Sequence, residues 1–337
     1  TAILFLIQRG LAAGITIYAP AIILSVVLGW NLKLLVIIIG LLVVFYTLIG
    51  GTQAVNITQK QQMFIIFLGM IAAFIFIVKG LPESLSFSNA LQLAGLNDKM
   101  NVLDFSIDPN NRYTFWSGIT GGLFLALSYF GTDQSQVQRY LSGKSLAESQ
   151  RGLIMNGFLK IPMQFFILLI GVLVFVFFQF EKAPLHFNPY AVEKVKSTPG
   201  GNKFEALEIA NDIIYQEKQK QLQKEDFFSN IGSQAKYLQL EKQAQRNRAE
   251  AKKIIEANQP QVESNDKDYV FIYFILNYLP KGLIGLLLAV ILSAAMSSAA
   301  SEINALSATT VVDLYKRFNG TGDEKHYVWA GKGFTLL

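Results

Sequence analysis

The residues best suited to chemistry form a small, hydroxyl-rich face on a segment that is otherwise apolar. Residues 282–291 are apolar, and the chain then places Ala294, Ser297, Ser298 and Ser301 at spacings of three and four. In an α-helix these four positions share one face. Such a face offers hydroxyl oxygens and close backbone approach where water is absent. The pattern therefore predicts either close helix contact or a site for a small, dehydrated cation.

Two cations lie inside apolar segments. Arg9 belongs to the stretch 3–18, where a charged side chain costs at least ~2.5 kcal/mol and tends to face a cavity or a partner. Its planar guanidinium can bind a carboxylate through two hydrogen bonds. Lys160 lies roughly 13 Å beyond Arg151 at helical rise, next to Pro162, which frees backbone carbonyls. Two interpretations stay open for each residue. Arg9 either faces a substrate or extends its side chain to the inner lipid headgroups. Lys160 either contacts a substrate or caps the backbone carbonyls that Pro162 leaves without a donor.

A third candidate is Tyr129, near the end of an apolar, glycine-rich segment. The sequence becomes polar around Gly131 and Asp133, which favours a broken helix of the kind that lines transporter binding sites. A tyrosine there presents an apolar ring and a hydroxyl, which suit stacking on a small solute or gating its path.

Composition points to a membrane protein. Hydrophobic residues make up 52% of the 337 residues and charged residues 16%, against about a quarter charged in soluble domains. The chain has no cysteine, its two histidines lie far apart, and no nucleophile–base pair, metal cluster or phosphate loop is visible. We therefore expect neither an enzyme nor an organic cofactor. The net charge of +5 indicates cytoplasmic membrane flanks rather than nucleic acid binding.

Six segments are long enough to span a membrane, which needs about 20 mainly apolar residues. They are Ala2–Gly29, Leu32–Ile49, Gln62–Val78, Trp116–Val137, Gly152–Phe178 and Pro280–Ser301. A polar turn is expected at 50–60, a mixed loop at 81–115, and a short interfacial or re-entrant helix at 269–280. Because the chain starts and ends in apolar sequence, we expect it to be part of a longer protein.

The predicted organisation has three parts: five spans in 1–180, a polar insert in 181–268, and the interfacial helix, the sixth span and a cytoplasmic loop in 269–337. The insert is rich in Glu, Lys and Gln, which favours a solvated cap with exposed helices near 204–225 and 237–257. The Lys/Arg bias of the short loops places the insert on the extracytoplasmic side.

Several ordered motifs together resemble the sodium:solute symporter family. The resemblance is carried by the stretch 292–316 with its Asp313-Leu-Tyr-Lys316 ending, Tyr129-Phe-Gly-Thr-Asp-Gln134, Val137-Gln-Arg-Tyr140, Tyr46-Thr-Leu-Ile-Gly-Gly51, Phe158-Leu-Lys160 and Ile15-Thr-Ile-Tyr-Ala-Pro20. These motifs are similar to those of the anion-transporting and sialic-acid-like branches, and they cover nearly the whole chain except the insert.

The resemblance implies an all-α integral membrane protein with a five-plus-five inverted-repeat core, of which this chain holds core helices three to eight. The membrane that we expect from it is a bacterial inner membrane. It also implies one sodium ion held by the Ala294 carbonyl and the Ser297 and Ser298 hydroxyls, with Ser301 as a further oxygen. By the same resemblance Tyr129 is an aromatic gate, Lys160 faces the substrate as in sugar symporters, and Arg9 binds a carboxylate.

Two departures limit what the resemblance implies. Gln59 stands where members with a second sodium site carry an aspartate, which disfavours a second sodium. Ala126 stands where sugar symporters carry an asparagine, which disfavours a sugar. The sequence therefore predicts a sodium-coupled importer of a small organic solute, with a carboxylate or other organic anion favoured. The alternatives are a transporter-like membrane sensor domain of a signalling protein and a sodium/sugar symporter; the oligomeric state stays open.

Overall fold

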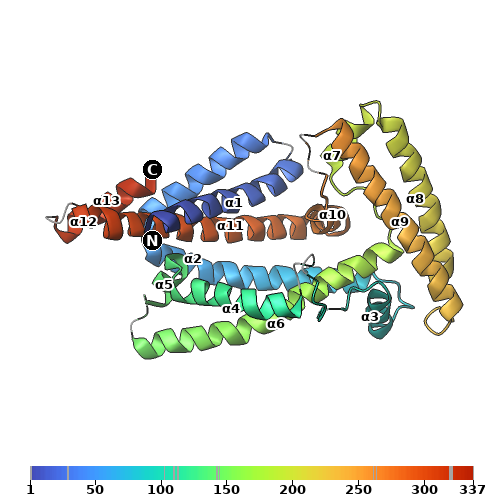
Figure 1. Ribbon diagram of the computed structural model, residues 1–337, viewed down its shortest axis with the longest axis horizontal. Helices are drawn as coiled ribbons and strands as arrows, with labels where there is room; N and C mark the ends of the chain where they lie inside the picture. The colour runs from blue at the N-terminus through green and yellow to red at the C-terminus, as the bar shows by residue number, and fades with distance from the viewer. Residues whose placement is uncertain are drawn as a thin grey trace. The chain divides into compact units, whose positions relative to one another are not determined.

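The computed structural model describes residues 2–28, 30–101, 103–108, 111, 114–141, 143, 145–260, 262, 264–318 and 322–336 (Figure 1). Within these ranges the chain contains helices and turns and no β-strands. The helices are α1 (Ala2–Leu28), α2 (Leu32–Gly80), α3 (Phe87–Leu96), α4 (Phe115–Gly131), α5 (Gln134–Leu141), α6 (Leu146–Phe180), α7 (Pro189–Lys196), α8 (Gly201–Leu222), α9 (Ile231–Asn258), α10 (Tyr269–Tyr278), α11 (Lys281–Thr309), the π-helix η1 (Thr310–Tyr315), α12 (Lys316–Phe318) and α13 (Glu324–Leu336).

Five segments of the described chain are long and apolar enough to cross a membrane: Ala2–Ser25, Leu32–Ile49, Gln61–Gly80, Leu146–Phe180 and Lys281–Phe318. They correspond to five of the six predicted spans. The predicted polar turn at 50–60 is wrong, because the backbone is helical there and α2 runs for 49 residues. A straight helix of that length would measure about 74 Å, far more than a hydrocarbon core of about 30 Å. Figure 1 shows instead that its two apolar arms run in different directions.

The remaining predicted span, Trp116–Val137, is divided between two helices. Helix α4 has 17 residues and begins at a capping box in which the Thr114 side chain accepts from the Ser117 backbone. It ends at Gly131, and α5 begins at Gln134. The predicted break around Gly131 is therefore confirmed.

The described chain divides into two units. The first contains residues 1–70, 103–163 and 281–337. Its buried cluster combines α1, the first arm of α2 and α11, and consists of Ala21, Leu35, Ile39, Val43, Ala299 and Ala300. The alanines allow the helix backbones to approach closely, which favours helix association in a membrane. As a result, the residues next to Ala299 and Ala300 on α11 are held against α1.

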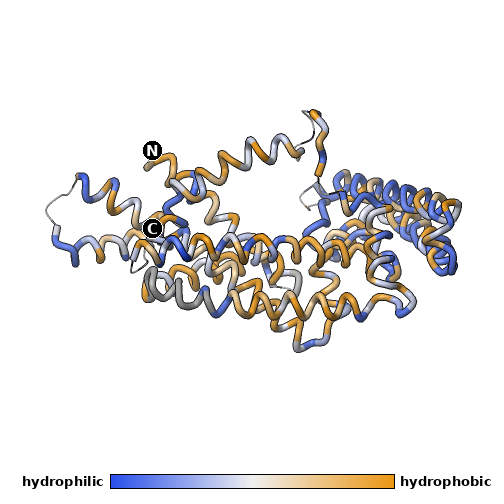
Figure 2. The backbone as a smooth tube through the Cα atoms, turned by 90° about the horizontal axis from the view of Figure 1, so that it is seen from below, coloured by the Kyte–Doolittle hydropathy of each residue, from blue (hydrophilic) through white to orange (hydrophobic). Residues whose placement is uncertain are grey.

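The second unit contains residues 71–102 and 164–280. Its helices α8 and α9 form a hairpin that is largely hydrophilic along its length (Figures 1 and 2). The helices predicted in the insert are confirmed, although α8 begins and ends three residues earlier than predicted and α9 extends beyond its predicted range at both ends. A buried cluster joins this hairpin to α7 and the chain before it: Leu185, Ala191, Val195, Phe204, Ala251 and Ile255.

Two further elements complete the second unit. The predicted loop at 81–115 contains the helix α3, whose N-cap Ser86 accepts a hydrogen bond from the Asn89 backbone. Helix α10 has 10 residues, too few to span a membrane, as predicted. Its aromatic side chains pack on α6, with the Phe274 ring 5.0 Å and the Tyr278 ring 4.7 Å from the Phe177 ring between centroids.

Candidate functional site

The hydroxyl-bearing residues of α11 are divided between the interior of the first unit and its surface. Ser297 and Ser301 are buried, Ala294 is partly buried, and Ser298 is exposed. The Ser301 hydroxyl donates to the Ser297 carbonyl at 3.0 Å. Ser298 therefore points its oxygen outward from this unit, and the Ala294 carbonyl precedes it by one turn.

Gln59, on α2, lies against the buried end of the same face. Its side-chain Nε2 donates a hydrogen bond of 3.1 Å to the Ser301 hydroxyl. This contact directs the positive end of the amide dipole at Ser301 and occupies one of its lone pairs. The arrangement disfavours a cation at Ser301.

Arg9 lies at the centre of a polar cluster formed by three helical segments. Its guanidinium forms ion pairs with the carboxylates of Asp133 and Glu302, the latter at 3.3 Å. It also donates to the Ser135 hydroxyl at 3.0 Å. Glu302 in turn accepts from the Thr16 hydroxyl at 3.1 Å. The cluster connects α1, the start of α5 and α11, since charged groups at membrane depth require partners.

The break between α4 and α5 positions Asp133. The backbone N–H groups of Thr132 and Asp133 both donate to the Ser128 carbonyl, each at 3.0 Å, which closes α4. The Asp133 carboxylate then accepts from the Ser135 backbone at 3.0 Å and from its hydroxyl at 2.8 Å. It therefore caps the N-terminus of α5 and faces Arg9 at the same time.

A cavity of about 620 Å³ adjoins this cluster. Its lining includes Arg9 and Gln8 from α1, Tyr129 from α4, Asp133, and Asp313 from η1. A π-helix widens the turn and often occurs at functional sites. The cavity is large enough for a small solute and brings two of the three predicted substrate residues, Arg9 and Tyr129, to one place.

The third predicted substrate residue, Lys160, lies next to Tyr129. Its Nζ is 5.4 Å from the centroid of the Tyr129 ring, in a cation–π contact. The Lys160 side chain is exposed, and α6 continues through Pro162 without interruption. The structure thus places Lys160 against the aromatic ring on the neighbouring helix.

Sequence analysis did not identify the long-range partners of Arg9. The structure shows that Glu302 on α11 pairs with α1 through Arg9 and Thr16. One local signal was available: Thr16 follows Arg9 by seven residues, so both lie on one face of α1. Such a face, carrying two polar groups in an apolar helix, indicates a polar partner in the bundle.

The profile of the sodium:solute symporter family matches residues 1–205 and 251–337. Among curated proteins, the chain is 34% identical over 154 residues to the sodium-coupled monocarboxylate transporter 2 of Mus musculus, covering 46% of this chain and 24% of the relative. It is 33% identical over 152 residues to the sodium/iodide cotransporter of Homo sapiens, covering 45% and 23%. The chain therefore matches about a quarter of the length of these relatives.

A solved structure, the substrate-bound outward-open state of a Na⁺-coupled sialic acid symporter, shares the fold. Its TM-score is 0.69 at 20% identity, and the match covers 99% of this chain and 54% of that chain. The family match and the apolar helices identify an integral membrane protein. Because the family profile matches well over half of the residues of this chain, the chain belongs to the sodium:solute symporter family.

Proposed function

We propose that this chain forms part of a sodium-coupled symporter that imports a small organic anion. The observation that carries the proposal is the α11 face. Ser297 is buried, while Ser298 presents its hydroxyl at the surface of the first unit, one turn after the Ala294 carbonyl. In this proposal one sodium ion is held by Ala294, Ser297 and Ser298 together with oxygens from outside this sequence.

The serine hydroxyls suit sodium because it is a hard cation that binds neutral oxygens. A carboxylate in the same place would add a charge that only a bound cation or a proton could compensate. The family assignment and the names of the relatives, which include sodium-coupled transporters and a sodium/iodide cotransporter, support sodium as the coupling ion. We propose no organic cofactor.

For the substrate, we propose an anion. Arg9 and Tyr129 line the cavity, and Lys160 lies over the Tyr129 ring. Arg9 is paired with Asp133 and Glu302, and Asp313 also lines the cavity, so Lys160 beside Tyr129 is the cation proposed to attract the anion. The Lys160 ammonium can attract a carboxylate, and the Tyr129 ring can cover an apolar body. The relatives named as monocarboxylate transporters agree with this chemistry. We propose that Tyr129 gates the site, while Lys160 attracts the anion.

We further propose that residues 1–180 and 269–337 supply the membrane part, and that the insert 181–268 lies on the extracytoplasmic side of a bacterial inner membrane. This orientation follows from the Lys/Arg bias of the short loops. The hydrophilic α8 and α9 support a solvated position for the insert.

Uptake in proteoliposomes containing the intact protein tests the proposal. An inward sodium gradient is expected to drive accumulation of small carboxylates such as propionate, and a potassium gradient of the same size is not. Ser298→Ala should raise the sodium concentration for half-maximal uptake about 10-fold, as expected for the loss of one oxygen ligand worth about 1.4 kcal/mol.

Ser307→Ala provides the matched control on the same helix. The Ser307 hydroxyl donates to the Gly331 carbonyl at 2.6 Å, away from the proposed site. This variant should keep the wild-type sodium dependence. Uptake that is unchanged after sodium is removed, or after Ser298→Ala, would contradict the sodium coupling proposed here.

A further inference from the structure

A second cavity lies within the second unit, between the end of α6 and the α8–α9 hairpin. Its volume is about 490 Å³. Eight of the lining residues belong to the segment 206–250, which the family profile does not match, among them Asn211, Lys218, Glu241 and Arg248. The cavity is therefore built in part from sequence that is peculiar to the insert.

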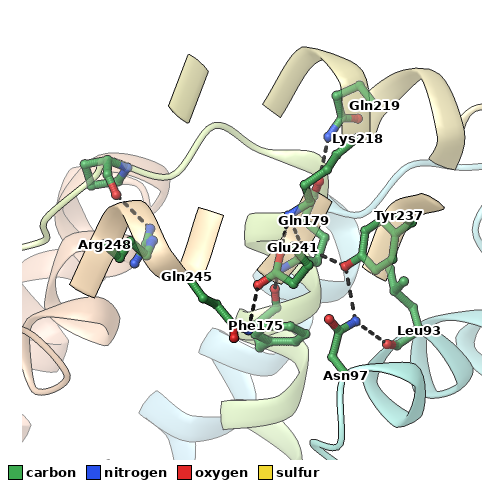
Figure 3. A network of polar contacts seen from close by, with 11 residues as sticks. Leu93, Asn97, Phe175, Gln179, Lys218, Gln219, Tyr237, Glu241, Gln245 and Arg248 are labelled. Atoms are coloured by element: carbon green, nitrogen blue, oxygen red, sulfur yellow. Dashed lines mark hydrogen bonds and ion pairs between the residues drawn. The ribbon is translucent and has the colours of Figure 1, made fainter. Parts of the chain in front are cut away.

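One wall is held by a buried polar network (Figure 3). The Lys218 Nζ donates to the Glu241 carboxylate at 2.5 Å and to Gln179 Oε1 at 2.7 Å. The Tyr237 hydroxyl also donates to Gln179 Oε1, at 2.9 Å, and accepts from the Asn97 amide at 3.1 Å. These contacts fix the α8–α9 hairpin on α6 and keep the shape of the cavity.

The charges that line the cavity include three cations, Lys99, Lys267 and Arg248, for which the described chain supplies no ion-pair partner. Lys218 pairs with Glu241, and Lys252 pairs with Asp266 at 2.7 Å. Arg248 donates to the Pro184 carbonyl at 2.7 Å and stacks on the Phe187 ring at 5.0 Å. Within the part of the chain that the structure describes, Arg248 has no ion-pair partner.

The environment of Arg248 favours an anion. Burial lowers the pKa of its guanidinium, although the nearby carboxylates of Asp266 and Glu241 oppose this effect. A desolvated guanidinium gains most from a planar anion that accepts two of its hydrogen bonds. A carboxylate group has this geometry.

Asn211 supplies a second feature that indicates a ligand. It is buried and lines the same cavity, and its Oδ1 accepts no hydrogen bond within the described chain. A buried acceptor without a donor costs free energy that a ligand hydroxyl would recover. The rings of Phe178, Phe187 and Tyr215 provide apolar walls between these polar groups.

We propose that this cavity binds a hydroxylated carboxylate, such as a sugar acid. The carboxylate pairs with Arg248, a hydroxyl donates to Asn211 Oδ1, and the carbon chain lies against the aromatic walls. This inference does not rest on sodium coupling, because none of these residues belongs to the proposed sodium or transport site.

Calorimetric titration of the intact protein in detergent tests the proposal. The probe is potassium gluconate in sodium-free buffer, so that the sodium-dependent transport site contributes little. We expect saturable binding of gluconate. Glucose, which lacks the carboxylate, and hexanoate, which lacks the hydroxyls, should each bind at least about 10-fold more weakly. Absence of gluconate binding, or equal binding of either analogue, overturns the proposal.

Two variants assign the contacts. Arg248→Gln should weaken gluconate binding about 10-fold or more. Arg246 is an exposed residue on the same helix, so Arg246→Gln should leave gluconate binding unchanged. Asn211→Leu removes the orphaned acceptor and fills part of the cavity, so it should raise the apparent Tm while weakening binding. This variant remains informative if Arg248→Gln fails to fold.

The outcomes separate the two proposals. Unchanged gluconate affinity in folded Arg248→Gln or Asn211→Leu protein contradicts the cavity as the site. Loss of gluconate binding in Arg248→Gln with unchanged sodium-driven uptake confirms that the cavity is a separate site. Gluconate binding in a protein that shows no sodium-driven uptake would support the cavity site and contradict the proposed function.

Discussion

The side-chain amide of Gln59 on α2 donates a 3.1 Å hydrogen bond to the hydroxyl of Ser301 on α11. The Ser301 hydroxyl in turn donates a hydrogen bond to the Ser297 carbonyl at 3.0 Å. A sodium ion at Ser301 would have to displace the amide, whose N–H dipole repels cations. The contact therefore supports the proposed sodium site at the Ser298 side of α11 over one at Ser301.

The first prediction concerns the number of sodium ions. Uptake by the wild-type protein should depend on sodium with a Hill coefficient near 1. Gln59→Asp replaces the amide with a carboxylate beside Ser301, so it should raise the Hill coefficient toward 2 or increase the apparent sodium affinity. A wild-type coefficient near 2 would show that the Gln59 contact does not exclude a second ion.

The second prediction concerns Arg9, which has two protein carboxylates as partners. Arg9→Gln leaves Asp133 and Glu302 together without their cation, and breaking such a buried pair costs about 3–5 kcal/mol. The variant should therefore accumulate poorly in the membrane. The double variant Arg9→Gln/Asp133→Asn removes one of the negative charges as well and should recover part of the folded protein.

The same variants decide whether Arg9 also binds the substrate carboxylate. If it does, the double variant should fold but show at least a 10-fold higher KM for a carboxylate substrate, because a charge-assisted contact is worth about 1.5–3 kcal/mol. If Arg9 acts through its protein partners alone, the double variant should keep a near-normal KM. Radiotracer uptake normalised to the amount of protein distinguishes the two.

Comparison of the predicted and observed helices shows which features depend on local sequence. The break around Gly131 and the two exposed helices of the insert were predicted because glycine, polar residues and helix formers act within a few turns. The turn expected at 50–60 was wrong because polar residues alone do not end a helix. That stretch contains no proline, and its backbone remains helical.

The contacts of the site could be predicted only in part, since they join residues far apart in the chain. Arg9 and Glu302 are separated by 293 positions, and neither local spacing nor composition identifies them as partners. Likewise, Ser297 and Ser298 are adjacent, yet the first is buried and the second exposed. That difference depends on how α11 packs against α1, which a single sequence does not reveal.

The third prediction tests the orientation of the chain. The printed sequence contains no cysteine, so a single introduced thiol in this region can be labelled specifically. Lys253→Cys on α9 and Arg317→Cys on α12 both alter exposed residues. In spheroplasts, a membrane-impermeant maleimide should label Lys253→Cys directly and Arg317→Cys only after permeabilisation. The opposite labelling pattern would reverse the proposed topology.

The fourth prediction concerns the ion pair that holds α8 to α9. The Lys218 and Glu241 side chains are 8% and 12% exposed, and their charged atoms lie 2.5 Å apart. Lys218→Met leaves the Glu241 carboxylate buried without its cation and should destabilise the protein by about 3–5 kcal/mol. The measurement is the apparent Tm in detergent, which should fall. Adding Glu241→Leu removes the unpaired negative charge and should restore much of the lost stability.

An exposed pair on the same helix is the matched control for this experiment. Lys220 and Glu217 also form an ion pair, but their side chains are 67% and 43% exposed. Water solvates both charges after either is removed, so Lys220→Met should change the apparent Tm little. Equal effects of Lys218→Met and Lys220→Met would mean that the buried network does not hold the hairpin.

The fifth prediction concerns the acid stability of the insert, through Asp266. Burial alone would raise the pKa of this carboxyl, but hydrogen bonds from Lys252 and the Phe187 backbone, with His186 nearby, lower it below its usual value. A carboxyl with a lowered pKa in the folded state stabilises the fold at pH values above its unfolded pKa of about 3.9. That contribution is lost as the pH falls below about 4 and the folded carboxyl becomes protonated.

Circular dichroism melts of the intact protein between pH 7 and pH 3 measure this effect. The apparent Tm of the wild type should fall as the pH drops below about 4. Asp266→Asn should melt at a lower temperature than the wild type at pH 7, and the difference should shrink as the pH falls toward 3, because the lowered pKa of Asp266 contributes less stability there. Asp268→Asn changes an exposed carboxyl two residues away and should follow the wild-type profile. If Asp266→Asn instead keeps a constant difference from the wild type at every pH, the ionised carboxylate is not what stabilises this part of the insert.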